Sequence, residues 1–191
     1  MTLDELVFVT SNLGKLREAE AVLGCRLDHR ALEIDELQSL DLDTVVRHKA
    51  AAAHRRLGTT VLVEDTSLEL SGMEGFPGPL IRWLLTSVGP EGICRVAHCF
   101  GDPKATVRCV VCATDGASEV LGTGVVRGLI APAPRGRRGF GWDATFVPDE
   151  GDGRTFGEME ESEKNAISHR RRAFEALRSA LAVSASSQNP G

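Results

Sequence analysis

No apolar stretch of this chain is long enough to cross a membrane, no excess of positive charge offers a surface to nucleic acid, and no leader pattern opens the sequence. The apolar runs among the 191 residues fall well short of the roughly 18 residues that span a bilayer. The net charge of -5 argues against a protein that tracks duplex phosphates, although a local cluster of cations could hold one small anion. The first residues lack the basic and apolar regions of a signal peptide. We therefore expect a cytoplasmic protein that binds neither membranes nor nucleic acid.

Cysteine is also scarce, with five residues at positions 25, 94, 99, 109 and 112. An odd number in a chain of this size is typical of a reducing compartment. Cys109 and Cys112 lie in a β-like run, where positions three apart point to opposite faces. We interpret the cysteines as small buried apolar residues and do not expect a zinc site.

The remaining composition, 42% hydrophobic and 26% charged, suits one globular domain with a real core. Apolar periodicity predicts strands at 6–9, 32–34 and 60–63, helices at 13–23, 42–57, 79–88, 90–97 and 162–182, and a hairpin of 106–114 with 119–126. Strands that alternate with helices predict an α/β fold, and the hairpin predicts a mixed sheet. We expect a single domain over residues 1–183 and a disordered tail over residues 184–191.

The helix predicted over residues 162–182 carries a charge on its apolar face. At about 100° per residue, Ile167, Phe174 and Leu177 fall on one stripe, and Arg170 falls in the middle of it. Lys164 falls on the opposite side, where charge belongs. A guanidinium on an apolar face is costly unless something anionic meets it, so Arg170 points to a bound anion.

A second cation of this kind follows the first predicted strand. The segment 10–15, Thr-Ser-Asn-Leu-Gly-Lys, runs into a helix start, where backbone N–H groups and the helix dipole favour an anion. Lys15 lies on the same face as Ala19 and Val22, inside the apolar stripe. The alternative is a lysine whose stem covers the core while its ammonium reaches water. Two cations buried at two helix starts favour a phosphate site, although the spacing is not that of a Walker A loop.

Two adjacent carboxylates, Glu64 and Asp65, end the predicted strand 60–63 at the edge where α/β sheets bind ligands. Such hard oxygen ligands suit Mg²⁺, which shares its sites with substrate phosphates, and one carboxylate could orient or deprotonate a water. The alternative is an ordinary acidic strand end. Glu36 could join the pair, but nothing local distinguishes it from Asp35.

An aromatic loop supplies the last candidate. In Gly-Phe-Gly-Trp-Asp (139–143), glycines flank two aromatic residues, which offers the flat apolar surface that a purine needs. A loop held on the core by its aromatic side chains explains the pattern equally well. His169, beside Arg170, adds hydrogen-bonding groups for the edge of a base.

Taken together, these segments resemble the inosine triphosphate pyrophosphatase family, the hydrolases of non-canonical purine nucleoside triphosphates. The likeness extends from Val7 to about Leu177. Five segments carry it in order: Val-Phe-Val-Thr-Ser-Asn-Leu-Gly-Lys (7–15), Leu-Val-Glu-Asp-Thr-Ser-Leu (62–68), Gly-Phe-Pro-Gly-Pro-Leu-Ile-Arg-Trp (75–83), Gly-Phe-Gly-Trp-Asp (139–143) and Ser-Glu-Lys-Asn-Ala-Ile-Ser-His-Arg (162–170). The resemblance implies an elongated α/β protein of two lobes around a long mixed sheet, with the active site in the cleft between the lobes, and a homodimer.

The resemblance also assigns roles to residues. The residues matched to catalysis are Asp65, as proton acceptor, and Lys15. Those matched to Mg²⁺ are Glu36, Glu64 and Asp65. Those matched to the phosphates, sugar and base are Thr10, Ser11, Asn12, Lys15, Lys49, Thr66, Arg82, Phe140, Gly141, Trp142, Asp143, Lys164, His169 and Arg170.

The implied reaction is the Mg²⁺-dependent hydrolysis of ITP, dITP or XTP to the monophosphate and pyrophosphate. The chain departs from the family pattern at Arg82, where relatives often have lysine, and at Ala144, where proline is common. Arginine for lysine keeps the charge but not the geometry, which leaves the substrate preference open. A pyrophosphatase for pyrimidine or methylated nucleotides, and a nucleotide-binding module without catalysis, are the alternatives.

Overall fold

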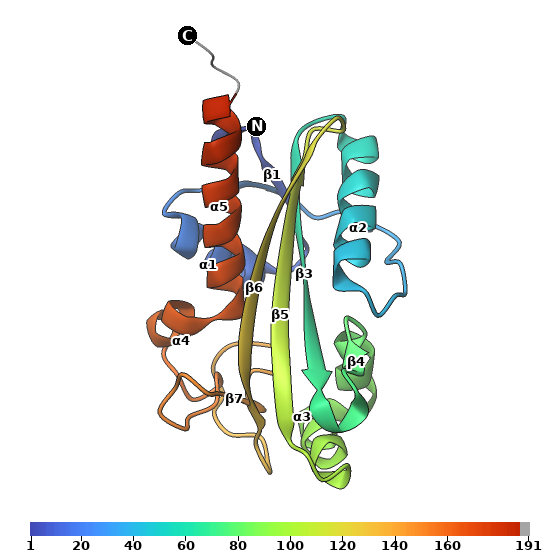
Figure 1. Ribbon diagram of the computed structural model, residues 1–191, viewed down its shortest axis with the longest axis vertical. Coiled ribbons are helices and arrows are strands. Elements are labelled where there is room, and N and C mark those ends of the chain that lie inside the picture. Colours follow the sequence, from blue (N-terminus) through green and yellow to red (C-terminus); the bar gives the residue numbers. More distant parts are fainter. Residues whose placement is uncertain (188–191) are drawn as a thin grey trace.

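A seven-stranded mixed sheet runs through the computed structural model, which describes residues 1–187 (Figure 1). The strands are β1 (Val7–Val9), β2 (Asp28–Arg30), β3 (Val61–Leu70), β4 (Pro77–Gly78), β5 (Lys104–Thr114), β6 (Glu119–Ile130) and β7 (Phe146–Pro148). Their order is β2-β1-β3-β5-β6-β7, with β4 paired to β3. The pairs of β1 with β2 and with β3 are parallel, and the other pairs are antiparallel. The predicted α/β class with a mixed sheet is therefore confirmed.

Two helices begin and end where the sequence predicts: α1 (Leu13–Leu23) and α2 (Leu42–Leu57). Asn12 and Asp41 cap their first turns by accepting hydrogen bonds from backbone N–H groups. Each helix ends at a glycine in the left-handed conformation, with a φ of 72° after α1 and 65° after α2. These local signals act without tertiary help, which is why periodicity and capping residues predicted both helices correctly.

The other helices are α3 (Ile81–Cys99), α4 (Glu161–Ile167) and α5 (His169–Ser187). α3 is kinked at Gly89, whose φ of 68° is not helical, in agreement with the two short helices expected there. The single helix predicted over 162–182 is wrong, because extended backbone at Ser168 separates α4 from α5. α5 continues four residues past the predicted domain end at 183, and the rest of the predicted tail, 188–191, lies outside the described residues.

Two strand predictions were also incorrect. The strand expected at 32–34 lies instead at 28–30, where Asp-His-Arg forms an exposed edge that has no apolar pattern. β3 does not end at residue 63 but extends to Leu70, because it pairs with β5 along its whole length, from Val61 with Thr114 to Leu70 with Ala105. This backbone pairing is long-range and leaves no local signature.

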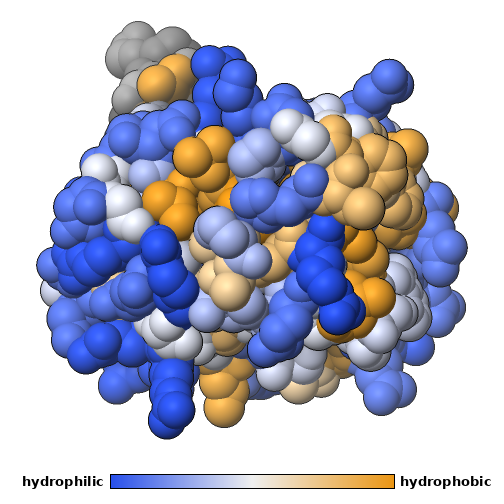
Figure 2. Space-filling model, turned by 90° about the horizontal axis from the view of Figure 1, so that it is seen from below, coloured by the Kyte–Doolittle hydropathy of each residue, from blue (hydrophilic) through white to orange (hydrophobic). Residues whose placement is uncertain are grey.

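Helices cover both faces of the sheet at one end of the long strands (Figure 1). Alternate residues of β5 point to opposite faces: Cys109 and Val111 pack under α1 and α5, while Val110 and Cys112 pack under α2. At the other end α3 covers a third apolar cluster, and the surface there shows apolar patches between charged residues (Figure 2). The predicted division into two lobes stays a prediction.

Three of the five cysteines, Cys94, Cys109 and Cys112, are buried as expected, whereas Cys99 is exposed and Cys25 is partly exposed.

Throughout residues 1–187, no helix is both long and apolar enough to span a membrane.

Candidate active site

A cleft of about 780 Å³ lies beside the sheet where β1 ends and α1 begins. α2, β3, the start of α3, the 139–143 loop and the start of α5 also contribute to its walls. Fifteen of the predicted site residues line it: Thr10, Ser11, Asn12, Lys15, Glu36, Lys49, Asp65, Thr66, Arg82, Phe140, Gly141, Trp142, Asp143, His169 and Arg170. Glu64 and Lys164 do not line the cleft and lie buried behind it.

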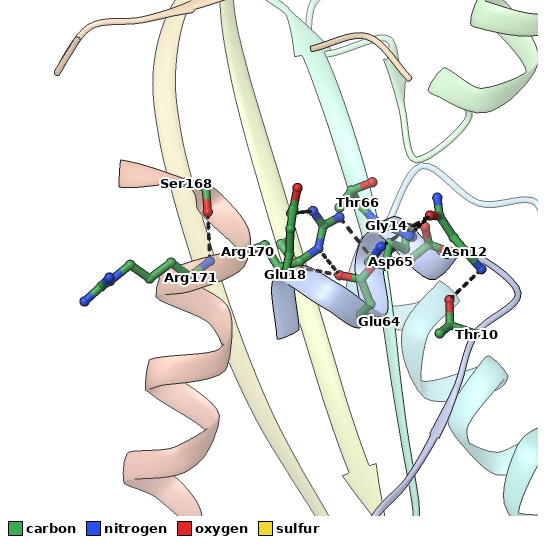
Figure 3. A network of polar contacts seen from close by, with 12 residues as sticks. Thr10, Asn12, Gly14, Glu18, Glu64, Asp65, Thr66, Ser168, Arg170 and Arg171 are labelled. Carbon is green, nitrogen blue, oxygen red and sulfur yellow. Dashed lines mark hydrogen bonds and ion pairs between the residues drawn. The ribbon is translucent and has the colours of Figure 1, made fainter. Parts of the chain in front are cut away.

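The first wall is the connection from β1 to α1. The side chain of Asn12 accepts hydrogen bonds from the backbone N–H groups of Gly14 at 2.9 Å and Lys15 at 3.3 Å. The backbone N–H of Asn12 donates to the Thr10 hydroxyl at 3.1 Å (Figure 3). This turn holds the start of α1 next to β3, because β1 ends at Val9 while the neighbouring β3 continues. The positive end of the helix dipole therefore faces the cleft, as a phosphate site requires.

Glu64 and Asp65 lie within β3 and not at its end, so their side chains point to opposite faces of the sheet. Asp65 points toward α2, where its Oδ2 lies 3.6 Å from Lys49 Nζ and its Oδ1 accepts the N–H of Thr66 at 2.8 Å. Glu64 points toward α1 and α5. The three carboxylates predicted to bind Mg²⁺ therefore do not converge, and among residues 1–187 no three acidic, histidine or cysteine side chains are grouped to hold a metal.

Two cations meet Glu64. Its Oε1 lies 2.6 Å from Lys15 Nζ, and its Oε2 accepts the Nε–H of Arg170 at 2.7 Å (Figure 3). Burial alone would raise the pKa of Glu64, but the charges of Arg170 and Lys15 hold it far below its usual value. Burial likewise opposes the charge of Lys15, and the carboxylates of Glu64 and Asp65 raise its pKa above the usual value. The two cations that the sequence placed on apolar faces thus share one buried carboxylate.

Glu18 of α1 completes this buried network, and the sequence analysis did not single it out. It accepts a hydrogen bond from Lys164 Nζ at 2.8 Å and another from Arg170 Nη1. Lys164 Nζ also donates to Asp143 Oδ2 at 2.6 Å. Three cations and three carboxylates are therefore joined in one network that borders the cleft: Lys15, Lys164 and Arg170 with Glu18, Glu64 and Asp143.

The position of Lys164 corrects the prediction that it faces solvent. Its side chain is only 3% exposed, because the break at Ser168 turns α4 away from the axis of α5. Burial and the charge of Lys164 act in opposite directions on the pKa values of its two carboxylate partners. Burial raises the pKa of Asp143 despite the neighbouring Lys164, whereas for Glu18 the charges of Arg170 and Lys164 outweigh burial and lower the pKa.

Both large side chains of the aromatic loop line the cleft, and Trp142 also belongs to a core cluster. The Phe140 ring lies over Lys164 Nζ at 4.8 Å and over the Arg170 guanidinium at 5.4 Å, and it packs so closely on α1 that a Cβ at Gly14 would lie 2.8 Å from it. Trp142 is 8% exposed and packs edge-on against Phe146. The loop is therefore anchored on the core by Trp142, and its role as a surface for a ligand stays a prediction.

His169 lies at the cleft wall between Trp142 and Phe156, with ring centroids at 5.5 and 6.2 Å. It is 2% exposed, and neither ring nitrogen has a hydrogen-bond partner within the described part of the chain. Burial, and then the charges of Arg170 and Lys164, lower its pKa well below 6.5. The ring is therefore neutral at pH 7 and offers one unused donor and one unused acceptor.

Glu36 and Arg82 face each other across the cleft, with Arg82 Nη1 3.3 Å from Glu36 Oε2. Both are exposed, at 39% and 71%, so the pair contributes little to stability. Of the two acidic neighbours that the sequence could not distinguish, Glu36 lines the cleft.

The family model for the Ham1 family matches residues 6–180 of this chain. The chain belongs to the Ham1 family. Two relatives, each named inosine triphosphate pyrophosphatase, support the assignment: the protein from Yarrowia lipolytica is 43% identical over 94% of this chain and 97% of its own length, and that from Giardia intestinalis is 43% identical over 92% of each. A solved HAM1 protein from Coxiella burnetii superposes with a TM-score of 0.80 at 26% identity, covering 94% of this chain and 99% of its own.

One signal in this Ham1 family member could have revealed Glu18. It follows Lys15 by three residues, which places it on nearly the same side of α1, beside the apolar Ala19 and Val22. A carboxylate next to a cation on an apolar face indicates a buried ion pair.

Proposed function

We propose that this chain hydrolyses non-canonical purine nucleoside triphosphates, namely ITP, dITP and XTP, to the monophosphate and pyrophosphate. The observation that supports this most directly is the cleft itself, which joins a helix start with Lys15, the open carboxylate of Asp65 and an aromatic wall with the neutral His169. In this proposal the helix start with Lys15 binds the triphosphate, Asp65 binds the attacking water, and the aromatic wall binds the purine. The relatives named inosine triphosphate pyrophosphatase favour the same substrate class.

The phosphate groups would lie on the turn 10–12 and the start of α1, where N–H groups and Lys15 stabilise the charge that develops on the pyrophosphate leaving group. Asp65 is the candidate proton acceptor, since it lines the cleft and its nearest ion-pair contact, Lys49 Nζ, is 3.6 Å from Oδ2. A water beside this carboxylate would attack the α phosphorus after losing its proton to Asp65.

Magnesium is part of the proposal. Mg²⁺ commonly binds one or two carboxylates together with substrate phosphates, so Asp65 and Glu36, which both line the cleft, fit it without a closed protein cage. When bound, the ion would neutralise the polyphosphate and polarise the phosphorus under attack. Glu64 does not fit as a third ligand, because both of its oxygens contact buried cations.

Base selection would rest on His169 and Arg170. A donor aimed at the 6-oxo group of hypoxanthine or xanthine would face the 6-amino group of adenine instead, and two opposed donors disfavour ATP. The unpartnered ring nitrogens of His169 support this assignment, since buried polar groups normally have a hydrogen-bond partner, which a base edge would supply here.

The test is pyrophosphate release from ITP, XTP, GTP, ATP, dUTP and a methylated pyrimidine triphosphate, with and without Mg²⁺, using Asp65→Asn as control. We expect turnover of ITP and XTP to exceed that of the other nucleotides and to require Mg²⁺. Arg170→Ala and His169→Ala should lower the ratio of ITP to ATP turnover. An unchanged ratio contradicts base selection by these residues, and preferred turnover of a pyrimidine contradicts the proposed substrate class.

We also propose that the chain acts as a homodimer in the cytoplasm, as the resemblance implies. The apolar patches at the α3 end of the molecule are a candidate for the contact between copies (Figure 2). Sedimentation velocity at micromolar concentration should give the mass of a dimer, and a monomer would contradict the proposal.

A further inference from the structure

Glu64 is the most completely buried carboxylate of the network, and it lies on the face of β3 opposite to Asp65. We propose that Glu64 is a positioning residue that holds Lys15 and Arg170 at a fixed separation on the floor of the cleft, and that it is not a metal ligand. The proposal rests on the proposed function and adds to it that the two adjacent carboxylates have different roles. Asp65 acts on the water and the metal from one face of the strand, and Glu64 positions the cations on the other face.

The contacts of Glu64 leave no room for a metal. Oε1 lies 2.6 Å from Lys15 Nζ and 3.5 Å from Arg170 Nη2, while Oε2 accepts the Nε–H of Arg170 at 2.7 Å and the thiol of Cys109 at 3.4 Å. A carboxylate has about four lone-pair sites, so these four donors use its whole capacity. Its side chain is 1% exposed, which closes the approach of a hydrated ion.

The same contacts tie the two ends of the site together. Lys15 belongs to the first turn of α1, beside the phosphate turn, and Arg170 belongs to the first turn of α5, beneath Phe140. A lysine side chain has four flexible bonds, so an ammonium without a fixed partner spreads over many rotamers. Glu64 supplies that partner from β3, which is hydrogen-bonded to β1 on one side and to β5 on the other.

A prepositioned ammonium needs little reorganisation when charge develops on the leaving group, and this is where electrostatic catalysis gains most. A misplacement of 1 Å can lower a rate by about 100-fold. Loss of Glu64 should therefore act on kcat. It should not weaken substrate binding, because Lys15 would pair with the anionic phosphates in place of Glu64, while Arg170 keeps Glu18 as a partner.

The experiment compares Glu64→Gln and Glu64→Asp with the adjacent Asp65→Asn. It measures kcat and KM for ITP, the Mg²⁺ concentration for half-maximal rate, and ITP binding in EDTA. Binding is followed by the fluorescence of Trp142 in a Trp83→Phe background, because these are the two tryptophans of the chain. The titration in EDTA measures the contribution of the protein's own cations to ITP affinity, because metal binding and turnover are both absent.

For Glu64→Gln we expect kcat to fall by about 100-fold, with KM, the ITP affinity in EDTA and the Mg²⁺ requirement no worse than about twofold. Asp65→Asn should instead raise the Mg²⁺ requirement. Glu64→Asp keeps the charge but is one methylene shorter, so kcat should fall by about tenfold or more.

A rise of tenfold or more in the Mg²⁺ requirement of Glu64→Gln would overturn the proposal in favour of a metal ligand. A folded Glu64→Gln variant with kcat within threefold of the wild type would overturn the proposal, because Glu64 would then contribute to stability and not to catalysis. If Glu64→Gln does not fold, a Glu64→Asp variant with wild-type kcat overturns the proposal. A wild-type protein that releases no pyrophosphate from ITP defeats the proposed function, whereas a weaker EDTA affinity of Glu64→Gln defeats the positioning role alone.

Discussion

Glu18→Gln tests the buried network, because Glu18 joins two cations and its loss leaves three cations with two carboxylates. The side chain is 6% exposed, and its partners Lys164 and Arg170 are each 3% exposed. Removing one member of a buried ion pair costs about 3–5 kcal/mol, since the remaining charge is left uncompensated. In a domain of this size each kcal/mol lowers Tm by about 2–4 °C, so we expect a loss of about 6–20 °C.

Thermal and urea unfolding measure this change, and an exposed pair on α5 supplies the control. Arg171 and Glu175 lie 2.8 Å apart with side chains 43% and 37% exposed, so Glu175→Gln should cost no more than about 1 kcal/mol. A Glu18→Gln variant within about 1 kcal/mol of the wild type would refute the view that this carboxylate neutralises the buried cations.

The pH dependence of stability follows from the same residue. The folded-state pKa of Glu18 lies below its usual value of 4.5, so its contribution is fully present above that pH and is lost as the pH falls toward the folded value. The free energy of unfolding of the wild type should therefore decrease below about pH 4.5, and more steeply than that of Glu18→Gln. Equal slopes in acid would contradict the lowered pKa.

Three further predictions follow from single contacts. Asp65→Asn should lower kcat for pyrophosphate release by about 10²–10⁴-fold while leaving the free energy of unfolding within about 1 kcal/mol, and a loss below tenfold would argue against Asp65 as the proton acceptor. Gly14→Ala should destabilise the fold by about 1–3 kcal/mol and raise KM for ITP, because its Cβ would lie 2.8 Å from the Phe140 ring. Helix propensity alone predicts a gain in stability, and such a gain would contradict this expectation. Because the pKa of His169 lies well below 6.5, the ring stays neutral and should not raise KM for ITP between about pH 8 and 6. A tenfold rise toward acid in the wild type that is absent from His169→Ala would show that the ring gains a proton there.

Sequence periodicity was most successful where structure is local. α1 and α2 were predicted to the residue, because their caps and apolar stripes lie within each segment. The predicted end of β3 at residue 63 was wrong, because the polar run Glu-Asp-Thr-Ser lacks the apolar pattern of a strand. The strand nevertheless continues through this run, since it is paired with β5. Such pairing joins positions 35 to 53 residues apart, and no local pattern records it.

The same division holds for the site. Lys15 and Arg170 could be found because a cation on an apolar stripe is a local anomaly, and both do lie at the cleft with buried carboxylate partners. The roles of Glu64 and Lys164 could not be found in this way. Glu64 depends on the length of β3, which sends it to the face opposite Asp65, and Lys164 depends on the break at Ser168, which a continuous helical pattern conceals.

The central claim is that water attacks the α phosphorus of a purine nucleoside triphosphate in this cleft. Hydrolysis of ITP in ¹⁸O-enriched water, with the products resolved by ³¹P NMR or mass spectrometry, tests it most directly. The account predicts inosine monophosphate carrying ¹⁸O and unlabelled pyrophosphate as the first products. Label in the pyrophosphate, or orthophosphate as the first product, would contradict it.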